Sequence, residues 1–495
     1  MSKLSCYFIF FICASLGTAL KFSHHHERIP LGCDEFGYLN LTKAFDENHE
    51  FKLPPQKAYL SGLIDTLRKC SIPDLDFAWM IGPHAYHLIP GTKKLINQYA
   101  PGTSMLMLVS GIAWRQITFP AIMMGLFIFL IVLINREQIK NRVTLFDFYL
   151  PALCLGMILM HPMQGVFQGI NSLAPTFGFL FAAGMLLHSK PLLATFLIAI
   201  TVNFRIVNGL MLLPVLLYLP FQWPIRKNNL YTNAALLTKY TLLITLAALP
   251  LFWYNYNLSG KLFFITHSIK DQENASWNGV IDNIKFYLSP IQRWLIVNIA
   301  TFLATICLQR ISKIDRRNLF LVSFLIINYA FFIIHRVKIG YYPYAPAIIF
   351  LGVIGGLLMV IEYNEKKVAH LFILMTSIIF LLKGSLDYIH HRPHKSFTEY
   401  KSKYLDLCTY DIVWCDEYSG TAEYTCTNSG FRYAWGPTTA RKIAFEYFKN
   451  HRLKQAILLF DIPINRSEII DEIESFGLSY HITKESLLGE IIEID

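Results

Sequence analysis

The chain has 495 residues, of which 54% are hydrophobic and only 16% are charged. This composition excludes an ordinary soluble protein and places the chain in the membrane class. The formal net charge of +10 does not indicate a nucleic-acid partner. Basic residues in short loops are how a multi-span protein sets its orientation, and membrane lipids are therefore the expected surroundings.

Apolar runs recur along the chain, and a helix needs roughly 20 apolar residues to cross a bilayer. We predict a polytopic α-helical protein with about eleven transmembrane helices. They are expected at residues 4–21, 116–134, 146–161, 167–187, 191–205, 207–220, 236–254, 291–309, 318–334, 343–361 and 368–385. The first run also fits a signal peptide, because Lys3 precedes it and small residues end it; an uncleaved anchor is the favoured interpretation.

The short connectors that are richest in Lys and Arg indicate which side faces the cytoplasm. They are Asn135–Leu145, Phe221–Asn233, Arg310–Arg317 and Glu362–Lys367. With the N-terminus inside, an odd number of spans places residues 22–115, 255–290 and those after 386 outside. We therefore expect a multi-pass protein of a bacterial inner membrane, with a cytoplasmic N-terminus and a periplasmic C-terminal domain.

The first outer loop, residues 22–115, carries the sharpest chemical signal. It opens with Gly32-Cys33-Asp34-Glu35-Phe36-Gly37-Tyr38 and ends with Tyr99-Ala100-Pro101-Gly102. Carboxylates held close to a membrane are costly to desolvate, so Asp34 and Glu35 are functional candidates, although an isolated Asp-Glu pair is more often solvated. Residues 101–114 are apolar but short, and we expect them to form an interfacial or re-entrant helix.

These two elements resemble those of the GT-C glycosyltransferases, in particular the protein O-mannosyltransferases and the bacterial aminoarabinose transferases of lipid A. In that superfamily an Asp-Glu-x-x-Tyr-like motif follows the first span, and a Tyr-Pro-Pro-Gly-like element returns the chain to the membrane. Here Ala100 replaces one Pro. The resemblance covers the whole chain and implies a GT-C-like transmembrane catalytic domain over residues 1–385, with a lid-like outer loop at 255–290.

By this resemblance Asp34 is the catalytic carboxylate, with Glu35 beside it. A hydroxyl acceptor loses its proton as it attacks the anomeric carbon of a sugar, and a positioned carboxylate can act as the general base. Nucleotide sugars are made in the cytoplasm, whereas this loop faces the other side. We therefore expect an inverting glycosyltransferase that takes its sugar from a polyprenyl-phosphate-linked donor. The acceptor hydroxyl is left open among lipid, protein and glycan.

A lipid phosphate needs Lys or Arg, and Arg can make forked contacts with it. Two outer segments offer such residues: Arg205 between apolar runs, and Arg336 with Lys338 before a run of tyrosines. We expect Tyr341 to join these cations at the donor phosphate. Snorkelling Arg residues and interfacial aromatic anchors are the structural alternatives. The remaining residues expected at the substrate loops are Tyr38, Tyr99, Pro101, Gly102 and Tyr344.

The nine cysteines contain no CxxC pair, so we assign no metal ligand. No cofactor is certain, and a divalent metal stays open, with Glu35 as one candidate ligand. In an oxidising compartment a Cys33–Cys70 bridge would brace the first outer loop. One disulfide and one free thiol are expected among Cys408, Cys415 and Cys426.

The hydrophobic periodicity changes after Lys383 and indicates a small α/β accessory domain over residues 386–495. Strands are expected at 411–415, 455–460 and 478–482, and helices at 438–450 and 466–475. The pair Asp416-Glu417 repeats the dipeptide of the first outer loop. We interpret it as a decoy that lies far from that loop.

Two other functions are weighed against glycosyl transfer. A lipid-linked glycan polymerase or ligase would also work on the outer face, but it generally lacks the early Asp-Glu loop and a large α/β tail. A membrane transporter is expected to show internal repeats, and the sequence shows none. Neither alternative accounts for both elements of the first outer loop.

Overall fold

The structure is a computed structural model. It describes residues 32–48, 58–109, 170–187, 189–216, 230–262, 277–289, 316–335, 345–360, 378, 382, 386, 404–426, 428–486 and 489–494. The spans expected at 4–21, 116–134, 146–161 and 291–309 lie outside these residues, as does all but two residues of the span at 368–385.

The chain divides into two compact units, and each unit is built from several separate segments. The first unit comprises Met1–His24, Ala113–Trp253 and Asp271–Arg392. The second comprises His25–Ile112, Tyr254–Lys270 and Pro393–Asp495. This grouping differs from the expected division at residue 385, because the first outer loop joins the C-terminal segment in a single unit.

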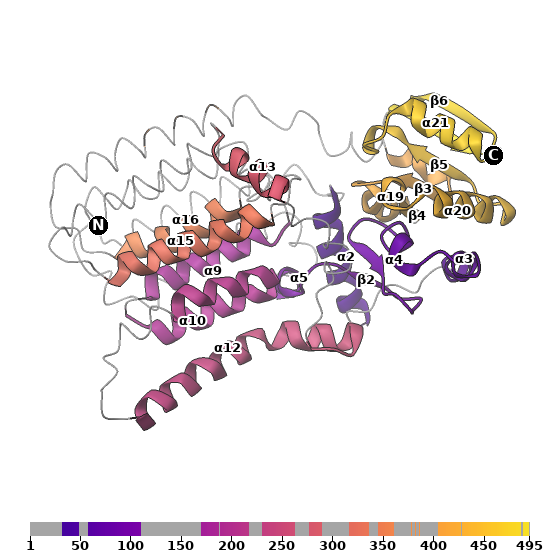
Figure 1. Cartoon of the computed structure of the whole chain (residues 1–495). Coiled ribbons are helices and arrows are strands. Elements are labelled where there is room, and N and C mark those ends of the chain that lie inside the picture. Colours follow the sequence, from indigo (N-terminus) through magenta and orange to yellow (C-terminus); the bar gives the residue numbers. More distant parts are fainter. Residues whose placement is uncertain are drawn as a thin grey trace. The chain divides into compact units, whose positions relative to one another are not determined.

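The described part of the first unit is helical (Figure 1). Its elements are α9 (Leu173–Leu186), α10 (Pro191–Ile200), η2 (Thr201–Asn203), η3 (Ile206–Met211), the main part of α12 (Leu230–Ser259), α13 (Trp277–Tyr287), α15 (Arg316–Ile334) and α16 (Ala345–Val360). Helices therefore lie in the runs expected at 167–187, 236–254, 318–334 and 343–361. Across the α15–α16 pair, Asn328 Nδ2 donates to the Pro346 carbonyl at 2.6 Å, so a buried amide links the two helices.

Among the described residues, α12 is the one helix long and apolar enough to cross a membrane, over Ala234–Ser259. Pro250 lies inside it and removes one backbone donor from the helical ladder. Asn203 fills the resulting break: its Nδ2 donates to the Ala247 carbonyl at 2.6 Å, and its Oδ1 accepts from the Leu251 amide at 3.0 Å. A side chain that replaces lost ladder bonds is how an apolar helix tolerates proline.

The N-terminal part of the second unit contains helices and one short hairpin. The elements are α2 (Gly32–Asn48), α3 (Ala58–Lys69), α4 (Asp74–Phe77), β1 (Tyr86–Leu88), β2 (Leu95–Asn97) and α5 (Gly102–Val109). Strands β1 and β2 pair antiparallel. The short apolar helix expected within residues 101–114 is present as α5.

The C-terminal part of the second unit is an α/β layer structure (Figure 1). Its elements are η7 (Asp406–Thr409), β3 (Ile412–Cys415), α19 (Ser419–Cys426), β4 (Ser429–Arg432), η8 (Tyr433–Trp435), α20 (Thr438–Asn450), β5 (Gln455–Leu458), η9 (Leu459–Asp461), α21 (Arg466–Ser475), β6 (Tyr480–Ser486) and β7 (Gly489–Ile494). The sheet order is β4-β3-β5-β7-β6; β4, β3 and β5 run parallel, and β7 is antiparallel to both of its neighbours. All five elements expected in this tail are present.

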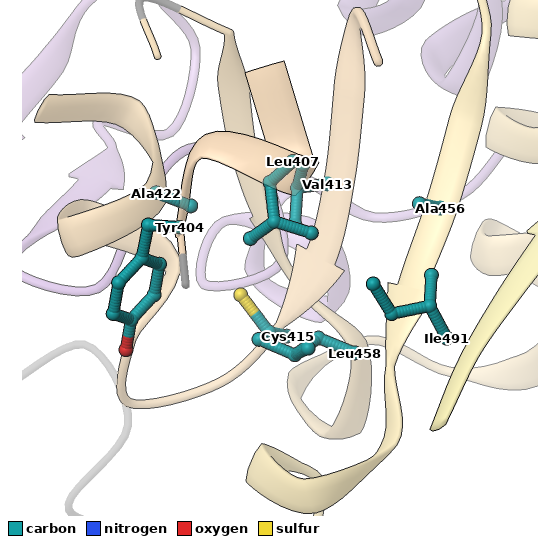
Figure 2. Close-up of a cluster of buried hydrophobic side chains, with 8 residues drawn as sticks. All are labelled: Tyr404, Leu407, Val413, Cys415, Ala422, Ala456, Leu458 and Ile491. Atoms are coloured by element: carbon teal, nitrogen blue, oxygen red, sulfur yellow. The ribbon is translucent and has the colours of Figure 1, made fainter. Parts of the chain in front are cut away.

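Side chains that alternate along β3 build cores on both faces of this sheet. Figure 2 shows the core that contains Val413 and Cys415. Its members are Tyr404, Leu407, Val413, Cys415, Ala422, Ala456, Leu458 and Ile491. On the other face Trp414 is fully buried, and its ring centroid lies 4.5 Å from that of Phe445 on α20. All four residues of β3 are therefore buried, two on each face of the sheet.

The disulfide pattern follows one expectation and overturns another. Cys408 and Cys426 form a disulfide, and Cys415 is a free, buried thiol, as expected for these three residues. The expected Cys33–Cys70 bridge is wrong, because both thiols are free. Cys70 is exposed just after α3, whereas the Cys33 sulfur accepts a hydrogen bond from the Tyr99 hydroxyl at 3.0 Å.

Candidate functional site

The first Asp-Glu pair occupies the first turn of α2. The helix begins at Gly32, whose φ of +80° is a conformation that favours glycine. Asp34 and Glu35 follow immediately and are 9% and 6% exposed. A helix N-terminus stabilises nearby anions, because its first amides and its dipole present positive charge. Two buried carboxylates therefore lie at the N-terminus of α2, where the helix dipole is favourable for negative charge.

The two elements of the first outer loop lie against each other. The ring of Tyr99 packs on that of Tyr38, with centroids 4.8 Å apart, and its hydroxyl reaches Cys33. Gly37 makes this approach possible, because a Cβ there would lie 2.4 Å from the Tyr99 ring. The Asn97 Nδ2 donates to the Gly37 carbonyl at 2.9 Å. The start of α2 and the strand before Tyr99 are thus fixed to each other.

The returning element continues into α5, which packs against α2. Pro101 is buried, and Gly102 is the first residue of α5. Ser104 on α5 donates its hydroxyl proton to the Tyr38 carbonyl at 3.0 Å. All four expected loop residues in the described part, from Tyr38 to Gly102, therefore belong to one packed cluster.

The second Asp-Glu pair is not a decoy, and that interpretation is wrong. Glu417 Oε1 accepts a hydrogen bond from the backbone amide of Cys33 at 3.1 Å. Gly32 again permits the contact, since a Cβ there would lie 2.8 Å from the same oxygen. The second carboxylate therefore caps the helix that carries Asp34, although 383 residues separate Glu417 from Asp34 in the chain.

The loop that carries Glu417 is held by a buried carboxylate. Asp461 Oδ2 accepts from the amides of Asp416 at 2.7 Å and Tyr418 at 2.8 Å. Ser419 donates its hydroxyl proton to the Asp416 carbonyl at 2.7 Å and accepts from the His84 amide at 2.8 Å. These bonds fix the loop backbone on both sides of Glu417.

Burial and local charge shift the protonation equilibria of this cluster. Burial would raise the pKa of Glu417, but the His84 imidazole and the Cys33 amide favour its anion and bring the pKa to about 2. Burial, followed by the charges of Asp34 and Glu417, raises the pKa of the Cys33 thiol well above its usual value. Burial raises the pKa of Asp461 to about 7, against the two amide bonds that it accepts.

A buried cation lies beside these carboxylates. Arg432 is fully buried at the end of β4, and its guanidinium carbon lies 5.2 Å from the Trp79 ring centroid and 5.4 Å from that of Trp435. Its Nη2 donates to the Tyr86 carbonyl at 2.5 Å. Burial lowers the pKa of Arg432 to about 9, while Asp416 acts in the opposite direction. The arginine joins the sheet to the first outer loop and brings positive charge to the site.

Three groups near the start of α2 have the chemistry of metal ligands. The Cys33 sulfur, an imidazole nitrogen of His84 and a carboxylate oxygen of Glu417 all lie within 4.8 Å of one another. They come from three separate segments of the chain, and the sequence analysis singled out none of them as a ligand.

Comparison with solved structures finds two forms of one protein over almost the whole chain. ArnT from Cupriavidus metallidurans bound to undecaprenyl phosphate matches with a TM-score of 0.55, 11% identity, and 99% and 98% of the two chains covered. The apo form matches with a TM-score of 0.56, 11% identity, and 99% and 97% covered. The chain has the ArnT fold. Comparisons with protein-family models and with curated proteins find no match.

The ArnT fold agrees with the resemblance read from the first outer loop, since ArnT is an aminoarabinose transferase of the GT-C superfamily. It is also a fold of the expected polytopic class. Of the expected donor-phosphate residues, Arg205 precedes η3 in the first unit and is half-buried. The others lie outside the described residues, as does Tyr344; they are Arg336, Lys338 and Tyr341.

Sequence reasoning missed His84, Arg432 and the contact of Glu417. No spacing pattern marks His84 or Arg432. One signal existed for Glu417: both Asp-Glu pairs are followed within three residues by a glycine, Gly37 and Gly420. Both glycines are sites of close packing. Gly37 lies against the Tyr99 ring, and Gly420 lies against the Phe36 ring.

Proposed function

We propose that this protein is a membrane glycosyltransferase that moves a sugar from a polyprenyl-phosphate-linked donor to a hydroxyl acceptor. The observation that carries the proposal is the fold shared with ArnT bound to undecaprenyl phosphate over 99% of this chain. The motif resemblance of the first outer loop supports it independently, because the fold comparison uses the backbone and the motif uses side chains.

Asp34 is proposed as the general base for the acceptor hydroxyl. It is buried on the first turn of α2, and a carboxylate in its anionic form can accept the proton of a hydroxyl group. The leaving polyprenyl phosphate is already a stable anion, so a strong general acid is not required. A single displacement by the acceptor inverts the anomeric configuration. Glu35, one residue along the same turn, assists in positioning.

The donor phosphate is proposed to bind Arg205, Arg336, Lys338 and Tyr341, with the substrate loops contributing the remaining tyrosines. Arg205 lies between apolar elements and is only partly exposed, which supports this role. The forked donors of a guanidinium suit the oxygens of a lipid phosphate.

The proposed setting is an inner membrane, with the N-terminus cytoplasmic and both the first outer loop and the C-terminal segment on the outer face. The grouping of residues 25–112 with 393–495 in one unit supports this, since two packed segments lie on the same side. The α12 helix is long and apolar enough to cross once. A donor that has already crossed the membrane then meets Asp34.

The proposal is tested by glycan mass spectrometry of cells that produce the chain, cells that produce Asp34→Asn, and cells without it. A glycosylated lipid, protein or glycan is expected with the wild type and absent from both others. Glu47→Gln, an exposed change on the same helix, is the matched control and should retain the product. Native mass spectrometry should still detect undecaprenyl phosphate on purified Asp34→Asn. An Asp34→Asn protein with full transfer activity would contradict the assignment of the base.

A further inference from the structure

The strongest group of side chains outside the proposed sugar-transfer chemistry is the Cys33, His84 and Glu417 cluster. Cys33 lies on the first turn of α2, His84 precedes β1, and Glu417 lies between β3 and α19. Their donor atoms are within 4.8 Å of one another. Three donors of different chemistry, brought together from three segments, form a more specific arrangement than an acidic patch.

The separations suit a small metal ion. Tetrahedral coordination at about 2.0–2.3 Å places ligand atoms about 3.3–3.8 Å apart. The His84 Nδ1 and Glu417 Oε2 atoms are 3.1 Å apart. The remaining donor atoms lie no more than 4.8 Å apart, about 1 Å beyond the upper end of that range. Hydrogen bonds of the Cys33 and His84 amides hold the three segments together.

His84 supplies a second, independent observation. It is 9% exposed, and its Nδ1 lies 3.1 Å from Glu417 Oε2. A buried imidazole nitrogen and a carboxylate oxygen at this distance can share a metal ion in place of a proton.

The backbone around the cluster is arranged to keep the three ligands in place. The His84 amide donates to Ser419, and the Cys33 amide donates to Glu417. Ala85, next to His84, has a φ of +98°, an unfavourable conformation for a residue with a Cβ. Such strain persists where the surroundings over-determine the backbone, and it is frequent at functional sites.

We propose that Cys33, His84 and Glu417 bind a divalent transition-metal ion, with zinc as the preferred ion. One sulfur, one nitrogen and one carboxylate oxygen match zinc chemistry and do not match magnesium or calcium, which take oxygen ligands. Three protein ligands leave a fourth position for water. The ion fastens the β3–α19 loop to the first turn of α2, and this role does not depend on the proposed sugar transfer.

The test measures metal binding on the full chain, purified through a tag without histidines. The starting protein carries His24→Ala, His25→Ala and His26→Ala, because that triplet binds metal ions without selectivity. After chelation and dialysis, zinc is titrated and counted by elemental mass spectrometry. Cobalt replaces zinc in a parallel sample, since a thiolate–cobalt charge-transfer band in the near-ultraviolet reports ligation by cysteine.

One zinc ion per chain and a cobalt charge-transfer band are expected. Cys33→Ser should abolish the band and weaken zinc binding at least about tenfold. Glu417→Gln should weaken zinc binding while keeping an oxygen that can accept from the Cys33 amide, so that loss of the helix cap does not explain the result. Cys70→Ser and Cys415→Ser are matched controls, one thiol exposed and one buried, and both should bind as the starting protein does.

Two results would overturn the proposal. The first is a starting protein that binds no zinc or cobalt at saturating concentration. The second is a charge-transfer band that survives Cys33→Ser or disappears equally in Cys415→Ser. Circular dichroism and the intact Cys408–Cys426 disulfide, checked on each variant, separate loss of the ligand from loss of the fold.

Discussion

The two Asp-Glu pairs of this chain have the same composition but are held in different ways. Asp34 and Glu35 lie on the first turn of a helix, and both side chains are buried. Asp416 and Glu417 lie in a loop after a strand, with the loop amides bonded to Asp461. The first pair is positioned by helix geometry, whereas the second is positioned by a network of backbone hydrogen bonds.

The comparison shows that the same dipeptide makes different contacts in a helix and in a loop. A helix start offers its own amides to the carboxylates, so the first pair suits an anion that reacts with a substrate. The second pair directs one carboxylate to another segment: Glu417 caps the very helix on which Asp34 lies. The first pair suits the proposed proton transfer, whereas Glu417 of the second pair joins the β3–α19 loop to α2.

Exchanging each aspartate for asparagine tests that division most directly. Asp34→Asn should reduce transfer activity by about 10²–10⁴-fold, because the amide cannot accept the acceptor proton. Asp416→Asn should reduce it less than about tenfold, since Asp416 Oδ1 accepts from the Ala434 amide and an amide oxygen accepts equally well. Turnover measured on matched amounts of folded protein checks both, and equal losses would break the comparison.

The pH dependence of stability tests how the second pair is held. Burial raises the pKa of Asp461 to about 7, from an ordinary value of 3.8, so the folded state binds a proton that the unfolded chain releases. Stability from this group is therefore present below the unfolded pKa and is lost as the pH rises towards 7, with a difference on the order of 3–4 kcal/mol. Asp461→Asn should flatten thermal stability between pH 4 and pH 8, whereas the exposed Glu468→Gln should not.

The disulfide next to the second pair should make a smaller contribution. Cys408 and Cys426 are 18 residues apart, and closing a loop of that length stabilises the folded state by about 3 kcal/mol. The double variant Cys408→Ser, Cys426→Ser should lower thermal stability by that amount while the free thiol at Cys415 stays buried. If the double variant unfolds at the same temperature as the wild type, the disulfide makes no measurable contribution to stability.

The contact between the two regions should be the most modest of these effects. A Cβ at Gly420 on α19 would lie 2.3 Å from the Phe36 ring on α2, so Gly420→Ala overpacks the contact by about 1–3 kcal/mol. Gly209→Ala is the control, because its nearest neighbour is the Val202 side chain at 3.8 Å. Denaturation in detergent measures both, and an unchanged Gly420→Ala would mean that the two regions separate easily.

Local signals in the sequence predicted the regular elements well. The helices expected at 438–450 and 466–475 have those bounds in the structure, because their apolar residues recur at helical spacing between clear breakers. The motif pattern placed the Asp34 element and the Tyr99 element in one loop, but it did not predict the contacts of Tyr99 with Cys33 and Tyr38. The strands β4 and β7 and the helix α19 were missed, and length alone is not the reason, since β7 is longer than the predicted strands β3 and β5.

What the sequence did not reveal depends on contacts between distant segments. The bond from the Cys33 amide to Glu417 joins residues 384 apart, and no periodicity reports such a pair. His84 is a single histidine in a turn, with no second ligand at a regular spacing. The expected Cys33–Cys70 bridge failed for the same reason, because closeness in sequence was used in place of closeness in space.

The Arg432 backbone amide donates to the Met80 carbonyl, and its guanidinium lies near the rings of both Trp79 and Trp435. A ribosome makes the earlier half of this cluster long before the later half. Residues 32–48 and Trp79 are therefore synthesised more than 350 residues before Arg432. The packed cluster around the first turn of α2 can be completed only after strand β4 has been made.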